Sequence, residues 1–466
     1  MFSAKSRLFA AAIGAVSMGA AAAWAADNTA QQDAKIRELE AKVAALEARQ
    51  ASSAREIAAT IDKVLRDAEK RSQLLAAGGD TAAGYDNGFF IRSGAWELRP
   101  GAMFQFRGVA DFRSDTFGDK GDETETGFEV RRMKFILEGT ALTKDLTYCF
   151  TWDTEVEGGS LKLSDAWAKY MFADEFGVRL GQFRDPVVRE WLVSDGKQLA
   201  VERSLMDAVL GGGFTGYTQG VTLIYGNYNK NNPVNVEFGV TDGANQVNTN
   251  FAGRPEPLPD PDPTTGLVTP SGHTLDWGIA GRVEVKAMGN WANYQDFSAM
   301  GTKEDLLVFG LGGDWSQGGD GDVWMLTADV QYESAAGLGV YAAAIYRDLD
   351  DELSGTTESW RDWGLLVQCG YMLNPSWEIF GRYDVIFADN DIVFDDGNTE
   401  DTFHEITVGV NYYMGKNGAA GHRAKVTIDL TYLPNGAPGA APGLGILDAN
   451  AGENEWILRG QFQLWL

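Results

Sequence analysis

Residues 103–113 read MFQFRGVADFR, and apolar and polar side chains alternate along this stretch with a period of two. In an extended chain Phe104 and Phe106 fall on one face, whereas Gln105 and Arg107 fall on the opposite face. Such alternation predicts a β-strand that has one apolar and one charged face. The two faces must therefore meet different surroundings in the folded protein.

The same alternation recurs in sixteen segments between residue 98 and the C-terminus. They begin near residues 98, 125, 146, 161, 177, 218, 233, 274, 303, 321, 338, 359, 376, 401, 421 and 454. Short connections such as 374–375 alternate with long ones such as 185–217, and this alternation with an even number of strands is typical of an antiparallel membrane barrel. The connection from Gly289 to Thr302 is longer than the pattern predicts for a short turn.

The lengths of the segments and the charges on their polar faces distinguish a membrane barrel from a water-soluble β-sandwich. Most segments are 11 to 15 residues long, whereas soluble strands usually have about 5–6 residues and tilted strands that cross lipid need about 9–11. Ionised side chains on the polar face need water, because burying them dry costs several kcal/mol each. We therefore expect an all-β fold, a 16-stranded antiparallel transmembrane β-barrel with its apolar face against lipid and its charged face around an aqueous lumen.

The first 25 residues are predicted to be a signal peptide. Lys5 and Arg7 precede an apolar, alanine-rich run that ends in Ala-Trp-Ala at residues 23–25, where a signal peptidase needs small residues. The alternative is a membrane anchor, but the run is shorter than the ~20 residues that an anchor needs, and polar sequence follows it. We expect export, cleavage after Ala25 and a barrel formed by residues 86–466.

Residues 26–85 are predicted to be a periplasmic α-helical coiled-coil segment followed by a glycine-containing linker. Residues 28–77 contain neither proline nor glycine, and apolar residues such as Ile36, Leu39 and Val43 recur every three or four positions. The apolar stripe is too narrow for a globular core, so the helix needs partner helices. A lone charged helix or a disordered stalk is the alternative.

The composition excludes several classes of function. The chain of 466 residues has 39 Lys and Arg against 66 Asp and Glu, and its net charge of −27 repels nucleic acid. Its 2 Cys and 3 His are too few for zinc sites, iron–sulfur clusters or a disulfide framework. No nucleophile–base pair can be argued from the sequence, so we expect no enzyme, no cofactor and no metal site.

Four stretches resemble the outer-membrane phosphate-selective porin O and P family. They are FEVRRMKFIL at 128–137, LSDAWAKY at 163–170, VRLGQFRDPVVREWLVSDGKQLAVERS at 178–204 and the closing WILRGQFQLWL at 456–466. The resemblance extends over essentially the whole predicted barrel, and the stretch 178–204 is its most specific part.

The resemblance implies a trimeric porin, surrounded by outer-membrane lipid, whose third long loop folds inward and narrows the pore. That loop would be residues 185–216, and the composition of residues 197–210 favours a short helix within it. In phosphate-selective relatives a column of arginines leads to a constriction lined by arginine and lysine. The candidate pore-lining residues are Arg107, Arg131, Arg132, Lys134, Lys169, Arg179, Arg184, Arg189, Lys197, Arg203, Arg282 and Lys286.

Strict alternation can turn only one of the adjacent Arg131 and Arg132 toward the lumen unless the strand contains a β-bulge. Ion preference stays open, because few lysines are available for the constriction, and acidic loops such as 348–352 and 389–401 attract cations within a Debye length of about 8 Å. The leading hypothesis is passive diffusion of small hydrophilic solutes or ions, with anions such as phosphate as candidates. The alternative is a structural envelope protein whose coiled coil tethers the barrel to the cell wall.

Deletion of residues 28–77 tests whether the coiled coil and the barrel have separate functions. If the coiled coil joins subunits or contacts the cell wall, the deletion weakens trimers or envelope attachment and leaves the conductance of the barrel unchanged. Native gel electrophoresis, envelope fractionation and bilayer recording measure these three properties. Loss of conductance in correctly folded protein would contradict this separation of functions.

Overall fold

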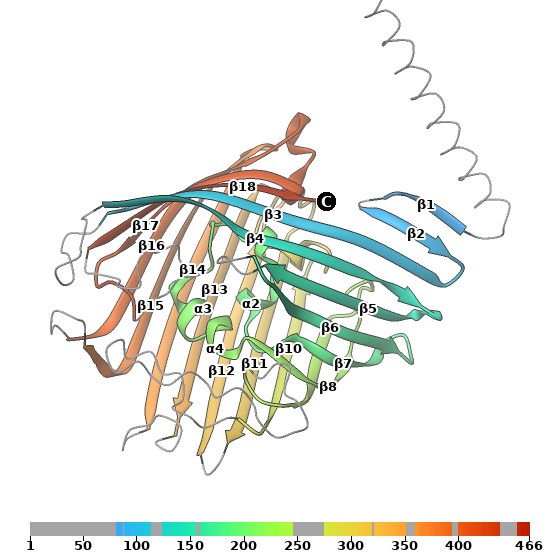
Figure 1. Cartoon of the computed structure of the whole chain (residues 1–466), viewed down its shortest axis with the longest axis horizontal. Helices are drawn as coiled ribbons and strands as arrows, with labels where there is room; N and C mark the ends of the chain where they lie inside the picture. Colours follow the sequence, from blue (N-terminus) through green and yellow to red (C-terminus); the bar gives the residue numbers. More distant parts are fainter. Residues whose placement is uncertain are drawn as a thin grey trace, which may run out of the picture. The chain divides into compact units, whose positions relative to one another are not determined.

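The described strands β3 to β18 close into a sixteen-stranded antiparallel barrel in the computed structural model (Figure 1). The structure describes residues 81–86, 88–112, 124–154, 159–245, 275–318, 321–350, 359–393, 399–438 and 454–466. The predicted signal peptide (1–25) and coiled coil (28–77) lie outside these residues. β18 pairs with β3, from Trp456 opposite Phe112 onward, and this pairing closes the sheet on itself.

The positions of the strands agree with the alternation in the sequence. The barrel strands are β3 (Trp96–Phe112), β4 (Thr124–Ala141), β5 (Thr143–Thr154), β6 (Leu161–Met171), β7 (Phe176–Arg184), β8 (Tyr217–Tyr225), β9 (Val234–Thr241), β10 (Trp277–Met288), β11 (Leu306–Gly318), β12 (Gly321–Glu333), β13 (Leu338–Leu349), β14 (Trp360–Asn374), β15 (Trp377–Val393), β16 (Thr399–Tyr413), β17 (Ala424–Leu433) and β18 (Glu455–Trp465). Each begins within three residues of its predicted start, and the predicted 16-stranded barrel is confirmed.

Apolar side chains face outward and polar side chains face inward. On β14, Leu365 and Val367 are 48% and 45% exposed on the outer face, whereas Gln368 on the inner face is 2% exposed. On β3, Phe106 is exposed and the neighbouring Arg107 is buried. Such an outer face is compatible with lipid hydrocarbon, because its side chains are apolar. The backbone polar groups, which lipid cannot hydrogen-bond, are paired between neighbouring strands of the closed sheet.

A hairpin that alternation alone does not predict precedes the barrel. It consists of β1 (Thr81–Tyr85) and β2 (Phe89–Ser93), and β2 also pairs with the start of β3. The guanidinium of Arg92 lies 4.9 Å from the ring centre of Phe90 and 2.6 Å from the carboxylate of Glu97. Residues 81–85, which the sequence analysis assigned to the linker, pair with β2 and therefore extend the sheet.

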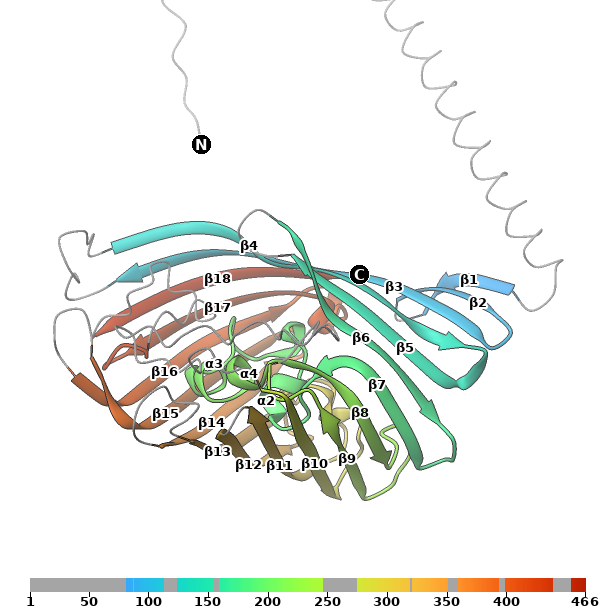
Figure 2. The same cartoon turned by 60° about the horizontal axis from the view of Figure 1, so that its bottom comes forward.

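Short helices occupy three of the connections between strands. They are α2 (Arg189–Leu192), η1 (Asp195–Lys197), α3 (Leu205–Val209) and α4 (Gly212–Thr215) between β7 and β8, η2 (Asn293–Gln295) between β10 and β11, and η3 (Lys416–Gly418) and η4 (Gly421–Arg423) between β16 and β17. The helices α2, α3 and α4 lie inside the ring of strands (Figures 1 and 2). Within the described residues, no helix has the length and apolar character needed to span a membrane.

A β-bulge in β4 turns two adjacent arginines toward the lumen. The pairing with β3 skips from Arg132 to Val130, so Arg131 has no residue opposite it. Both guanidiniums reach the same carboxylate, that of Glu202. The bulge thus removes the restriction that strict alternation places on this pair.

A charged residue on the outer face tests its contact with lipid. Leu365→Arg near the middle of β14 should lower the free energy of unfolding by about 2–4 kcal/mol, because its guanidinium enters hydrocarbon. Leu142→Arg in the β4–β5 turn, where the side chain is 67% exposed at a strand end, is the control and should cost about 0–1 kcal/mol. Urea unfolding in lipid vesicles measures both costs. Equal costs would contradict the assignment of this face to lipid.

Candidate functional site

Loop L3, defined as residues 185–216, crosses the lumen and packs against part of the barrel wall. Most of its residues are buried, and the exposed fraction of Leu205 and of Met206 is 0%. Gly312 of β11 permits close approach of the loop, because a Cβ there would lie 2.2 Å from the carbonyl oxygen of Val187. L3 therefore fills one side of the lumen as a packed structure.

Glu202 in L3 binds three arginines of the wall. Its carboxylate oxygens lie 2.6 Å from guanidinium nitrogens of Arg107, Arg131 and Arg132. Burial acts to raise its pKa, but the three arginines hold the pKa of Glu202 well below its ordinary value. The carboxylate is consequently ionised at neutral pH, and charge-assisted hydrogen bonds offset the cost of its desolvation.

Asp195, the first residue of η1, is a second anionic anchor of the loop. The ammonium of Lys134 lies 2.6 Å from its carboxylate, the guanidinium of Arg184 lies 3.3 Å away and that of Arg132 lies 3.8 Å away. Arg203 of L3 itself forms a further ion pair with Asp195. Burial raises the pKa of this aspartate, yet the surrounding cations, Arg203 foremost, hold it well below its ordinary value.

The strands β15 to β17, which are joined to β3 through β18, hold the backbone of L3. Arg382 donates to a carbonyl oxygen of the loop at 2.8 Å. The carboxylates of Glu405 and Asp429 accept hydrogen bonds from the backbone N–H groups of Leu205 and Val201 at 2.7 and 2.8 Å. L3 is therefore held by a continuous charged part of the wall, through its side chains at β3 and β4 and mainly through its backbone at β15 to β17.

The helix expected within residues 197–210 is limited to residues 205–209. Lys425 and Asn411 of the wall donate to the carbonyl oxygens of residues 198–199 at 2.7 and 3.0 Å. A helix would need these carbonyls for its own hydrogen bonds. Contacts with the wall thus override the local propensity for helix.

The water-accessible part of the lumen lies beside β5, β6 and β7. Their inward-facing side chains are half-buried, among them Asp165 and Lys169 of β6 and Arg179 of β7. By contrast, the inward faces of β11 to β17 are mostly buried where L3 packs. Arg179 is paired with Glu237 at 2.5 Å, whereas no ion pair with Lys169 is found among the described residues. L3 therefore leaves the inward side chains of β5 to β7 partly exposed.

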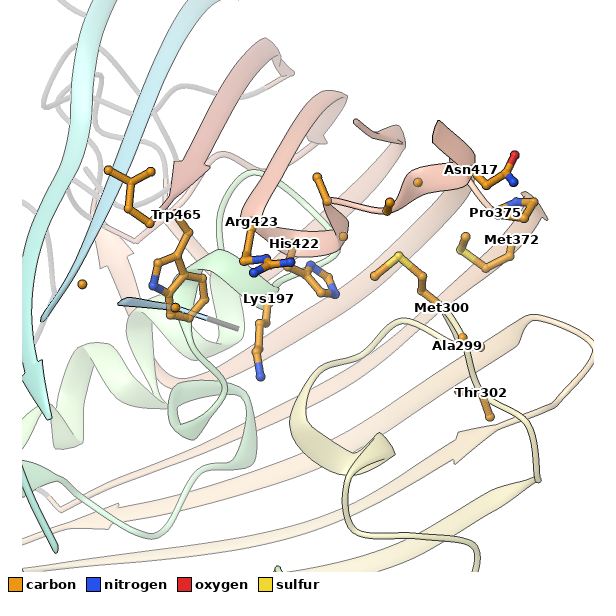
Figure 3. Close-up of a pocket in the computed structure, with 18 of the residues that line it drawn as sticks. Lys197, Ala299, Met300, Thr302, Met372, Pro375, Asn417, His422, Arg423 and Trp465 are labelled. Carbon is orange, nitrogen blue, oxygen red and sulfur yellow. The ribbon is translucent and has the colours of Figure 1, made fainter. Parts of the chain in front are cut away.

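A cavity of 960 Å³ lies at the end of the barrel where the short turns are, and Figure 3 shows residues that line it. Lys197 of L3 and His422 and Arg423 of η4 line it together with Glu138 of β4 and Trp465 of β18. We call this cavity the turn-side mouth. Charged groups from the loop, a turn and the wall meet there.

The structure divides the twelve predicted pore-lining cations into three groups. Those that anchor L3 are Arg107, Arg131, Arg132, Lys134, Arg184 and Arg203. Those buried beside the connection between β10 and β11 are Arg189, Arg282 and Lys286. Those that are half-buried along the passage or at its mouth are Lys169, Arg179 and Lys197. That all twelve contribute to an ion pathway stays a prediction.

The sequence analysis missed the inward course of the connection between β10 and β11. Trp291, Tyr294 and Phe297 of this connection are buried inside the barrel. The available signal was a connection longer than a short turn and rich in aromatic residues. It also missed the wall carboxylates that bind the backbone of L3, because alternation identifies the inner face of a strand but not the partner that each side chain meets.

Residues 104–254 match the sequence model of the family "Phosphate-selective porin O and P". This match confirms the resemblance of that part of the chain, which includes L3 and all six basic residues that anchor it. No curated protein matches the chain. Among solved structures, OprB of Pseudomonas putida has a similar fold, with a TM-score of 0.50 and 12% identity over 80% of this chain and 94% of that chain.

Two further solved structures show weaker similarity over most of both chains. The outer membrane channel DcaP of Acinetobacter baumannii is 13% identical, with a TM-score of 0.45 over 82% of this chain and 100% of that chain. OmpT of Vibrio cholerae, an outer membrane protein in its trimer form, is 11% identical, with a TM-score of 0.47 over 79% of this chain and 99% of that chain.

Glu202→Gln tests the anionic anchor of L3, since it removes the charge and keeps the shape of the side chain. Loss of the shared counter-ion of buried Arg107 and half-buried Arg131 and Arg132 should lower the free energy of unfolding by about 3–5 kcal/mol. Urea unfolding of the refolded barrel measures this cost. Asp174→Asn, which breaks a surface ion pair with Lys230, is the control and should change stability little.

The same variant changes the dependence of stability on pH. Because the pKa of Glu202 is lowered on folding, its contribution is present above its ordinary value of 4.5 and is lost as the pH falls below it. Glu202→Gln should therefore lack this part of the acid-induced loss of stability. If Glu202→Gln changed neither the free energy of unfolding at neutral pH nor its loss at acidic pH, Glu202 would not anchor L3.

Proposed function

We propose that this protein is an outer-membrane porin through which small hydrophilic solutes and ions diffuse passively. The observation that carries the proposal is the sidedness of the barrel, with apolar side chains outside and ionised side chains around a lumen that L3 narrows. The family match over residues 104–254 supports the same function. Barrel and family indicate a channel rather than an enzyme.

Solutes in the proposed passage meet positive charge at Lys169 and Lys197. Lys169 faces the lumen near the end of β6 that leads into the short β6–β7 turn, and Lys197 lines the turn-side mouth. Each ammonium group can replace part of the hydration shell of a passing anion. Asp165 and Glu138 lie on the same inner face, so we propose a weak preference for anions, with phosphate as the candidate that the family implies.

The six basic residues that anchor L3 have a different part in the proposal. Their charges are paired with carboxylates, so they hold the loop in position and set the width of the passage. They contribute less to attraction of anions than an unpaired column of arginines would. A strong phosphate selectivity based on these six residues is therefore not part of the proposal.

The proposal includes an orientation and an oligomeric state. In outer-membrane barrels the short turns face the periplasm and the long loops face outward, which would place the turn-side mouth on the periplasmic side. The trimer is proposed from the family resemblance. The alternative function, a tether to the cell wall, depends on residues 28–77 and has no support within the described residues.

Recording in planar lipid bilayers with a KCl gradient tests the function. Purified protein should produce stepwise conductance and a reversal potential that indicates a weak preference for chloride. Lys169→Glu should move the reversal potential toward cation preference, because the substitution reverses a charge beside the passage. Lys144→Glu makes the same change at an exposed position at the turn end of β5 and should resemble the unmodified protein.

Two outcomes would contradict the proposal in different ways. Folded protein that never produces conductance would contradict a pore of any selectivity. Equal reversal potentials for Lys169→Glu and Lys144→Glu, in channels that conduct, would remove the role of Lys169 and leave the pore itself in place.

A further inference from the structure

Residues 289–305, between β10 and β11, form a second segment that enters the lumen. We call them the inner turn segment, because they enter from the end of the barrel where the short turns lie. Trp291, Tyr294 and Phe297 are 0%, 1% and 2% exposed, in a connection that in most antiparallel barrels is a solvated turn. Gly339 of β13 permits its approach, because a Cβ there would lie 2.8 Å from the carbonyl oxygen of Phe297.

Hydrogen bonds hold the inner turn segment to strands on different sides of the barrel. The Tyr294 hydroxyl donates to the carboxylate of Glu284 on β10 at 3.1 Å. The Ser298 hydroxyl donates to the carboxylate of Glu378 on β15 at 2.7 Å. Since β10 and β15 are separated by four strands in the sheet, the segment crosses the inside of the barrel. It is therefore a fixed part of the lumen and not a loose turn.

The inner turn segment also contacts L3 directly. The guanidinium of Arg189, in α2 of L3, lies 3.7 Å from the ring centre of Tyr294 and 5.7 Å from that of Phe297. The same guanidinium donates to the carbonyl oxygen of Tyr294. Cation–π contacts of this kind are strongest where water is excluded, and Arg189 is 8% exposed. The two inserted segments are thus joined inside the barrel.

The inner turn segment contributes Met300 to the lining of the turn-side mouth and places the carboxylate of Asp296 beside His422 of that lining. Met300 lines the mouth, and its terminal methyl carbon lies 3.2 Å from the position that a Cβ on Gly421 would take (Figure 3). The carboxylate of Asp296 lies 3.5 Å from the imidazole of His422, which lines the same cavity. Asp296 also attracts Lys197 of L3 electrostatically.

We propose that the inner turn segment is a second constriction element of the pore, in which Met300 limits the width of the turn-side mouth and Asp296 weakens its attraction for anions. The proposal rests on the proposed porin function and adds a second place of selection to it. Solutes that pass L3 are selected again, by size at Met300 and by charge at Asp296, before they leave the barrel.

Substitution of Met300 tests the size limit. Met300→Trp should lower single-channel conductance and exclude larger sugars in a liposome-swelling assay, because the indole fills part of the mouth. Met300→Ala should raise the single-channel conductance and the rate at which larger sugars enter the liposomes, because it shortens the side chain. Met288→Trp is the matched control, since Met288 is exposed at the end of β10 rather than in the mouth, and it should conduct like the unmodified protein.

Substitution of Asp296 tests the charge effect. Asp296→Asn should increase the permeability of chloride relative to potassium, because it removes a carboxylate that opposes the charge of Lys197 at the mouth. Glu304→Gln removes one negative charge from an exposed position of the same segment and is the control. It should leave the permeability ratio unchanged.

The outcomes separate this inference from the porin function. If the unmodified protein conducts while the Met300 variants match Met288→Trp and Asp296→Asn matches Glu304→Gln, the second constriction is wrong and the porin function stands. If the folded, unmodified protein does not conduct, the porin function is wrong. Opposite changes in conductance for Met300→Trp and Met300→Ala, with a selectivity shift confined to Asp296→Asn, are the result that the structure leads us to expect.

Discussion

The separation of apolar from ionised side chains by the two faces of each strand is the constraint on which the rest of this structure depends. Alternate residues of an extended chain must face opposite ways, so a strand such as β3 exposes Phe106 on the side opposite to Arg107. Lipid can accept the first face and water the second. Closure of β18 onto β3 then satisfies the backbone and encloses the charged face within a lumen.

A lumen lined with ionised groups allows a loop to be fixed by charge. Glu202 and Asp195 provide L3 with two anionic points, and six basic side chains from the wall and the loop gather around them. Buried ion pairs of this kind contribute less to net stability than to the selection of one arrangement, because desolvation offsets much of the attraction. Their consequence for transport is geometric: L3 stays against β3, β4 and β11 to β17 and leaves the inward side chains of β5 to β7 partly exposed.

The limits of sequence analysis follow from the same physics. Strand starts were predictable within three residues because a period of two is a local property. The helix expected from the composition of residues 197–210 shrank to residues 205–209, because Lys425 and Asn411, distant in sequence, took the carbonyl groups that it needed. The hairpin of β1 and β2 was missed for a similar reason, since pairing with β3 stabilises it.

The sequence by itself determined the number of barrel strands and, away from the β-bulge in β4, the face that each residue occupies, because alternation is a property of neighbouring residues. The inward course of the long connection 185–216 was implied by the family resemblance. Only the tertiary structure decided which inward charges are neutralised and which face water. Arg132 and Lys169 both occupy inward positions, yet Arg132 meets Glu202 of L3 and Lys169 faces the passage. That difference arises because Coulomb energy depends on distance in space, and the fold brings together residues that are about 70 positions apart in the chain.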